Sequence, residues 1–112
     1  MKFKNEETKD LKSFKHKAKR GENYFLTIFD ESGIKTINIS KLNKKLITFG
    51  KGNNNDIIIF SDSIATRQGY FEITEYGVLA VNTTKGTFMK GTDNRLFDEI
   101  YLAEGSFIKI NS

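Results

Sequence analysis

Three polar turns in the middle of the chain separate segments of strand length, and this spacing constrains the fold more than any other feature. The turns are rich in Gly, Asn, Ser and Thr and occupy residues 50–56, 61–68 and 82–87. The segments beside them are residues 56–60, 69–74 and 77–81. These segments are rich in β-branched and aromatic residues, as strands usually are. We therefore expect the turns to connect strands and to hold most of the residues available for recognition.

The remainder of the chain after residue 22 continues the same series of short strands. Residues 30–33 form a turn between the strand-like segments 24–29 and 34–39, which indicates a β-hairpin. Further strand segments are residues 46–49, 87–90, 95–102 and 106–110. Short strands at this spacing, with no helical period after residue 20, predict an all-β antiparallel β-sandwich.

Apolar positions along these segments predict the core of the sandwich. Each such side chain contributes about 1.5–3 kcal/mol when fully buried, before its entropy cost is subtracted. The expected core residues are Leu26, Ile28, Ile47, Phe49, Ile57, Ile59, Phe71, Ile73, Leu79, Val81, Phe88, Leu96, Ile100, Leu102, Ile108 and Ile110.

The basic character of the chain is concentrated before the predicted sandwich. Residues 1–20 carry a net charge of +5 against +4 for the whole chain, so the rest carries −1. Leu11, Phe14 and Ala18 have the spacing of one helical face. We expect residues 1–21 to be a basic N-terminal arm that can form a short helix, and residues 22–112 to be one domain.

Composition excludes several classes of function. The chain has no cysteine and a single histidine, His16 in the arm, which removes disulfides, thiolate chemistry and most zinc sites. No carboxylates form a recognisable catalytic pair. We therefore expect a protein that is not an enzyme, with no cofactor and no bound metal. The chain has no apolar run long enough to span a membrane and no secretory signal, which favours the cytoplasm.

The order of the loop motifs resembles that of the forkhead-associated (FHA) domain family, with its SMAD/FHA-type β-sandwich. The matching motifs are Gly50-Lys51, Asn55-Asp56-Ile57, residues 64–71, residues 84–91 and the closing strand at 102–108. The resemblance covers about residues 22–112. It implies an apical phosphothreonine-binding surface made by the three loops.

The resemblance also suggests which residues hold the phosphopeptide. Family positions that contact phosphate or peptide fall on Lys51, Ala65, Thr66, Thr84 and Lys85, and Arg67 adds a charge beside them. Ala65 lacks the hydroxyl that the family uses, and Lys51 lacks the bidentate fork of arginine. A register slip of two residues would put Ser63 at the position of Ala65. The candidate phosphopeptide-binding residues are Lys51, Thr66, Arg67, Thr84 and Lys85.

Other loop residues are expected to shape the backbone. Gln68 occupies the position of the family's loop-bracing histidine, and its amide can bond backbone groups. Glycines serve turns, where they enter positive φ freely. Asn and Asp in loops bond nearby amides. The candidate structural loop residues are Gly50, Asn55, Asp56, Gln68 and Gly86.

The leading functional prediction is a non-catalytic signalling module that binds phosphothreonine peptides from Ser/Thr kinase substrates. Its ligand could be its own arm, since Thr8 is followed at +3 by Leu11. The alternative is a degenerate FHA domain that serves as a phosphate-independent scaffold or assembly module. Nucleic-acid or anionic-surface binding by the arm is the third reading, and only Phe3 and Phe14 are available there for base stacking.

Overall fold

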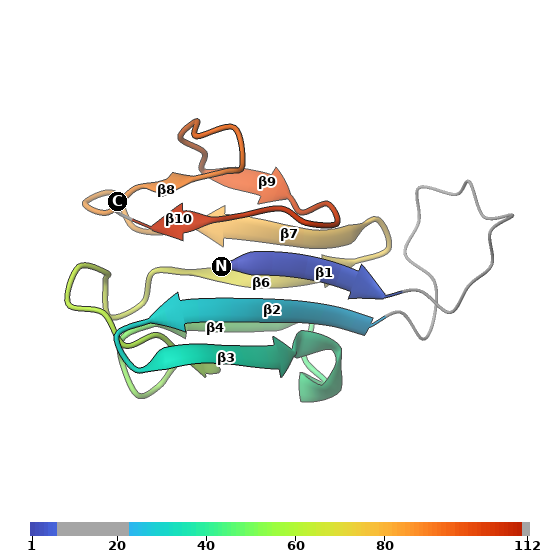
Figure 1. The fold of residues 1–112 in the computed structure, drawn as a ribbon, viewed down its shortest axis with the longest axis horizontal. Helices are drawn as coiled ribbons and strands as arrows, with labels where there is room; N and C mark the ends of the chain where they lie inside the picture. Colours follow the sequence, from blue (N-terminus) through green and yellow to red (C-terminus); the bar gives the residue numbers. More distant parts are fainter. Residues whose placement is uncertain (7–22, 111–112) are drawn as a thin grey trace, which may run out of the picture.

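The β-branched and aromatic segments of the sequence form strands in the structure, a computed structural model that describes residues 1–6 and 23–110 (Figure 1). The strands are β1 (Lys2–Glu6), β2 (Asn23–Asp30), β3 (Gly33–Asn38), β4 (Leu46–Gly50), β5 (Ile57–Ile58), β6 (Gly69–Thr74), β7 (Gly77–Asn82), β8 (Met89–Lys90), β9 (Glu99–Tyr101) and β10 (Lys109–Ile110). The predicted hairpin is confirmed, because Asp30 pairs with Gly33 at the β2–β3 turn.

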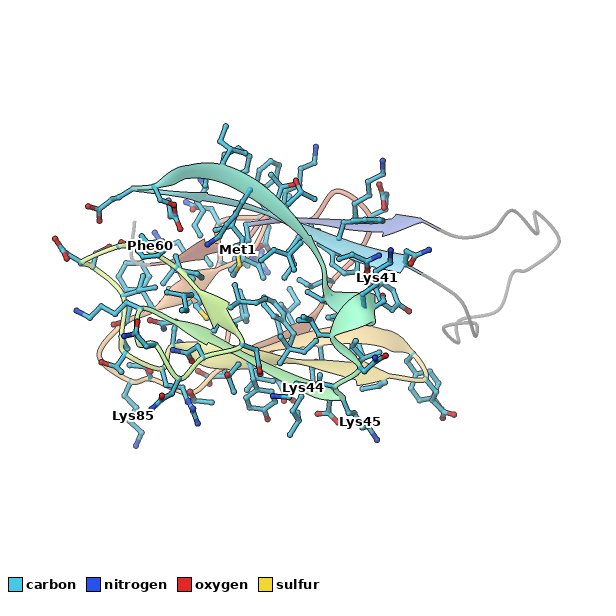
Figure 2. The ribbon with its side chains drawn as sticks, turned by 90° about the horizontal axis from the view of Figure 1, so that it is seen from below. Met1, Lys41, Lys44, Lys45, Phe60 and Lys85 are labelled. Atoms are coloured by element: carbon cyan, nitrogen blue, oxygen red, sulfur yellow. The ribbon has the colours of Figure 1, made fainter. Side chains whose placement is uncertain are left out.

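Two main sheets pack face to face. One has the order β1-β2-β3 and the other β5-β4-β6-β7-β9, while β8 and β10 form a two-stranded ribbon. Figure 2 shows the first sheet and the β4, β6 and β7 strands as two layers with side chains between them. Except for the parallel β4–β5 pair, the pairings between these strands are antiparallel. The predicted all-β antiparallel sandwich is therefore confirmed.

The only helix within residues 1–6 and 23–110 is the short 3-10 element η1 (Ile39–Leu42). The Asn38 side chain caps its start by accepting a hydrogen bond from the Ser40 N–H, and Asn43 ends it in the left-handed conformation. No helix of this described part is long and apolar enough to cross a membrane.

The predicted core is confirmed in its centre. Phe49 of β4 and Phe71 of β6 are fully buried, and their rings stack with centroids 4.7 Å apart. Half of the sixteen predicted core residues are buried, namely Leu26, Ile28, Ile47, Phe49, Ile57, Ile59, Phe71 and Ile108. Ile73, Leu102 and Ile110 are partly buried and pack against this cluster.

The remaining core predictions are wrong where the apolar run does not alternate. In β7, Val78 and Ala80 are buried and not Leu79 and Val81, because an unbroken apolar run leaves the phase of the strand open. Near β8 the buried residue is Met89, while the neighbouring Phe88 is exposed. The last two of the sixteen predicted residues, Leu96 and Ile100, are also exposed.

The start of the chain belongs to the sandwich and not to an arm. Lys2–Glu6 forms β1 and pairs with β2, and the Phe3 ring is buried in a stack with Tyr24. The prediction that residues 1–21 lie outside the domain is therefore wrong for this stretch. A single buried Phe among charged residues gives no local strand signal, because the pairing partner lies some twenty residues away. The predicted helix around Leu11, Phe14 and Ala18 lies outside the described residues.

One close backbone approach inside the sheet gives a stability test. A Cβ added at Gly69 would lie 2.0 Å from the Val81 carbonyl oxygen, whereas one added at Gly86 would meet nothing within 4 Å. We predict that Gly69→Ala lowers the free energy of unfolding by about 2–3 kcal/mol and that Gly86→Ala changes it by less than about 0.5 kcal/mol. Urea denaturation of both variants measures this, and equal stabilities would contradict it.

Candidate functional site

The three loops that carry the predicted binding residues are hydrogen-bonded to one another at one end of the sandwich. In the β4–β5 loop, the Lys51 N–H donates to the Ala65 carbonyl of the β5–β6 loop at 3.1 Å, and the next N–H donates to the Thr66 carbonyl at 3.0 Å. From the β7–β8 loop, the Thr84 hydroxyl donates to the Arg67 carbonyl at 2.8 Å. Residues 65–67 therefore lie between the other two loops and hold them together.

The Gln68 side chain is the buried centre of this arrangement. It is fully buried, and its Oε1 accepts a hydrogen bond from the Ala65 N–H at 3.1 Å. Its Nε2 donates to the Asn82 Oδ1 at 2.9 Å and to the Thr87 carbonyl at 3.3 Å. Both ends of one amide thus join two loops and the end of β7, which is the bracing expected of Gln68 from the sequence.

Asn82 is a structural residue that sequence reasoning missed. Its Oδ1 accepts hydrogen bonds from the Gln68 amide and from the Thr84 N–H, and its Nδ2 donates to the Thr87 carbonyl at 3.0 Å. An Asn directly after an apolar strand and before Thr-Thr is a turn-forming signal that could have identified it.

Asn55 and Gly50 fix the approach of the first two loops. The Asn55 Nδ2 donates to the Gly52 and Thr66 carbonyls at 2.8 and 2.6 Å, while its buried Oδ1 has no hydrogen-bond partner among the described residues. A Cβ at Gly50 would lie 2.3 Å from the Thr66 carbonyl oxygen. Glycine is therefore required at position 50 because the Thr66 carbonyl lies so close to its Cα. The sequence prediction attributed the role of Gly50 to positive φ, which Gly50 does not adopt.

The predicted structural role of Gly86 has no such basis. Its φ lies outside the left-handed region, and a Cβ there would meet no atom within 4 Å. The glycines with positive φ in the described chain are Gly33, Gly77 and Gly105.

Asp56 ties the β4–β5 loop to β4. Its Oδ1 accepts a hydrogen bond from the Lys44 Nζ at 2.5 Å, and its Oδ2 accepts from the Thr48 N–H at 2.9 Å. The Lys44 hydrogen bond, followed by the bond from the Thr48 backbone, lowers the pKa of the Asp56 carboxyl from its ordinary value. The sequence predicts that Asp56 bonds amides of its loop. Asp56 does accept a bond from a backbone amide, but this amide belongs to Thr48 of β4 and not to the loop.

The cationic candidates are exposed and free of ion pairs within the described residues. Lys51, Arg67 and Lys85 all extend from the hydrogen-bonded loops into solvent. Lys51 lines a hollow of about 310 Å³ that also contains two acidic residues, Glu31 and Asp62. Lys85 lines a second hollow with other residues of its loop and Asp98. Lys51 and Lys85 therefore line two separate hollows of the loop rim, and Figure 2 places Lys85 at the end of the sandwich opposite Lys45.

Hydroxyl groups at this surface are less available than the sequence suggests. The Thr84 hydroxyl hydrogen is already donated to the Arg67 carbonyl, so its oxygen remains only an acceptor. Thr66 is exposed and its carbonyl accepts bonds from Gly52 and Asn55. Its side chain is the remaining hydroxyl among the five predicted binding residues. The possible internal ligand, Thr8, lies outside the described residues.

Replacing the buried Gln68 amide should weaken the whole rim. Gln68→Met keeps the size of the side chain but leaves the Ala65 N–H without its acceptor. We predict a loss of about 2–4 kcal/mol in the free energy of unfolding, because a buried unpaired donor costs about 1–3 kcal/mol and two further bonds disappear. Asn54→Met, at an exposed loop position, is the matched control and should change stability by less than about 0.5 kcal/mol. Equal losses in both variants would contradict this role.

The lowered pKa of Asp56 gives a pH-dependent prediction. A carboxyl with a folded-state pKa below its unfolded value contributes stability above the unfolded pKa of about 4, and this contribution disappears as the pH falls through the folded pKa. Asp56→Asn should therefore reduce the free energy of unfolding at pH 7 by roughly 1–2 kcal/mol. The difference from the unsubstituted protein should shrink below pH 4. Urea denaturation across this range measures it, and a difference that persists unchanged at acid pH would contradict it.

Comparison with known proteins adds no assignment to this geometry. No protein-family model matches the sequence, and comparison with curated proteins finds no significant relative.

Proposed function

We propose that this domain is a non-catalytic, cytoplasmic interaction module that binds phosphothreonine peptides of Ser/Thr kinase substrates. The observation that carries the proposal is the joining of three loops at one rim with exposed Lys51, Arg67 and Lys85 and no ion pair to any of them within the described chain. A phosphoryl group brings about −1.5 to −2 charges at pH 7 and three acceptor oxygens, which suit such a surface. The resemblance to the FHA family in the order of the loop motifs supports the same function.

The geometry favours recognition by side-chain charge over recognition by the loop backbone. The N–H groups of Lys51, Gly52, Ala65 and Thr84 are already used in bonds between and within the loops. Each cation at about 4 Å from a phosphate charge contributes only about 1 kcal/mol in water. Three such contacts with a group of about −1.5 to −2 charges sum to about 4.5–6 kcal/mol, which corresponds to a dissociation constant of roughly 40 µM to 0.5 mM with a strong salt dependence.

The second candidate function is a phosphate-independent scaffold that retains the fold. Ala65 has no hydroxyl, and the Thr84 hydroxyl is engaged with the Arg67 carbonyl. Both facts remove phosphate donors that the FHA resemblance would require. Under this reading the loop network serves rigidity alone and the exposed cations are ordinary surface charges.

A matched pair of peptides discriminates the two functions. We predict that a phosphothreonine peptide binds, that its unphosphorylated form binds at least tenfold more weakly, and that raising the salt concentration weakens binding. Lys51→Ala combined with Lys85→Ala should weaken binding at least tenfold through lost charge attraction. Lys41→Ala combined with Lys45→Ala, at exposed positions of η1 and of the segment before β4, removes the same two charges elsewhere and should leave binding unchanged.

Fluorescence anisotropy with labelled peptides provides the measurement, and thermal unfolding confirms that each variant is folded. Equal affinity for both peptide forms would reject phosphate recognition and favour the scaffold function. An equal effect of the combined Lys41 and Lys45 substitutions would show that binding depends on net charge and not on the rim.

A further inference from the structure

A groove of about 530 Å³ lies between the end of β2 and strand β10. Its apolar lining includes Ile28, Ile59, Ile64, Ile108 and Ile110, and Met1 lies at one end of it. In Figure 1 both β2 and β10 extend beyond the start of β1, and most of the residues that line the groove belong to the ends of these two flanks. Glu31, Ile59 and Ser61 line both this groove and the hollow beside Lys51, whereas none of Lys51, Arg67 and Lys85 lines the groove itself.

The backbone segments on both sides of β1 extend beyond the start of β1. Lys2 of β1 pairs with Thr27 of β2 and, on its other side, bridges to Phe107. β2 then continues for three more residues to Asp30, and the other flank continues to Ile110 of β10. The groove therefore lies in line with β1, between the ends of these two flanking strands.

Both walls present backbone groups to this position. Asp30 and Gly33 are the hydrogen-bonded pair that closes the two-residue hairpin between β2 and β3. Hydrogen-bonded and non-hydrogen-bonded pairs alternate along an antiparallel ladder. Phe29, the next residue of β2, therefore directs its N–H and C=O away from β3 and toward the groove. On the other wall, the Ile108 N–H donates a hydrogen bond to the Met1 carbonyl at 2.7 Å, and the Met1 amine donates one to the Ile108 carbonyl at 2.5 Å. By the same alternation, Ile110 directs its backbone groups into the groove.

Side-chain alternation defines what a strand in the groove would bury. Phe3 is buried, and Met1 packs against the same core. A strand in line with β1 would thus turn its residue next to Met1 outward and its second residue inward, toward Ile59 and Ile64. An apolar side chain is needed at that second position.

The polar groups at the two ends of the groove favour one direction for a bound strand. The Met1 α-amine lies at one end of the groove, where it donates to the Ile108 carbonyl, and Lys109 also lines the groove. Asp30 and Glu31 line the groove near the far end of the β2 wall. Burial lowers the pKa of the Met1 amine to about 6, and a neighbouring carboxylate would favour its charged form again. A chain running in the direction of β1 brings its C-terminal carboxylate to this amine.

We propose that the groove binds the C-terminal end of an extended polypeptide, added to the sheet in line with β1. The bound chain would place an apolar penultimate residue over Ile59 and Ile64 and its terminal carboxylate at the Met1 amine. The last residue bonds to Phe29, and the penultimate residue bonds to Ile110. This is recognition by strand addition, in which backbone bonds give affinity and alternate side chains give specificity.

Synthetic peptides test the carboxylate and the register separately. The probe is a fluorescein-labelled Thr-Val-Thr-Val-Thr peptide with a free carboxylate, whose penultimate residue is apolar. The controls are the same peptide with a C-terminal amide and the sequence Val-Thr-Val-Thr-Val, which moves the apolar side chains outward. We expect the free acid to bind at least tenfold more tightly than either control. Equal binding of acid and amide, equal binding of both registers, or no binding at 1 mM would overturn the proposal.

A substitution in the groove wall tests the ladder. Ile110→Pro removes the backbone N–H that faces the groove, on a two-residue strand at the end of the described chain. We expect it to weaken the free-acid peptide at least tenfold. Lys45→Ala, at an exposed position that lines neither the groove nor the rim hollows, is the control and should not affect this peptide. If the proline variant binds as well as the unsubstituted protein, strand addition at this wall is wrong.

A covalent occupant provides a test that needs no free ligand. Adding Met-Val-Thr before Met1 puts Val at the inward position and Thr beside Met1, whereas Met-Thr-Val reverses these positions. We expect the first extension to raise the melting temperature above that of the second and to prevent binding of the peptide. Equal melting temperatures together with retained peptide binding would show that the groove does not accept a strand.

Discussion

The arrangement of the loop rim depends on the buried amide of Gln68. Its oxygen and nitrogen reach the Ala65 N–H, the Asn82 side chain and the Thr87 carbonyl, which belong to separate parts of the chain. A buried amide must satisfy both of its ends or destabilise the fold, so this side chain also fixes the distance between the loops that it joins. Loss of the amide would leave the positions of the exposed residues on these loops unspecified.

Close backbone contact completes what the amide begins. Gly50 allows the Thr66 carbonyl to approach to a distance that no side chain would permit, and the N–H groups of Lys51 and Gly52 then bond to the facing loop. These contacts make the rim well defined, but they use the backbone donors that could otherwise hold an anion. Any recognition at this surface therefore depends on the cationic side chains, and for such interactions salt screening is decisive.

The sequence predicts those parts of the fold whose signals are local. The β2–β3 hairpin follows from a polar turn between two strand-like segments, and β6 has the predicted bounds of residues 69–74. β1 could not be predicted, because its stability comes from pairing with β2 and from burial of Phe3 across the sheet. The phase of β7 could not be predicted either, since only packing decides which side of an unbroken apolar run faces the core.

The same distinction applies to the site. The resemblance to the FHA family implied that residues 51, 66 and 84 lie on neighbouring loops, and hydrogen bonds join these loops in the structure. The hydrogen-bond partner of each polar group could not be predicted from the sequence. The Thr84 hydroxyl donates to a backbone carbonyl, and the Asn82 side chain makes hydrogen bonds to Gln68, Thr84 and Thr87. Side-chain hydrogen bonds depend on ångström-scale geometry that a residue type alone does not specify.

The segment between β5 and β6 contributes to both surfaces, the loop rim and the groove. Ile64 is buried and lines the groove, whereas Arg67, three residues later, is exposed on the rim. Between them the Ala65 N–H is bonded to Gln68, which anchors the backbone to the sheet at the point where it passes from one surface to the other. The two surfaces also meet at Glu31, Ile59 and Ser61, which line both the groove and the hollow beside Lys51. A ligand on the rim and a strand in the groove would therefore be neighbours across this braced segment, and substitutions that separate their effects must lie outside the shared residues.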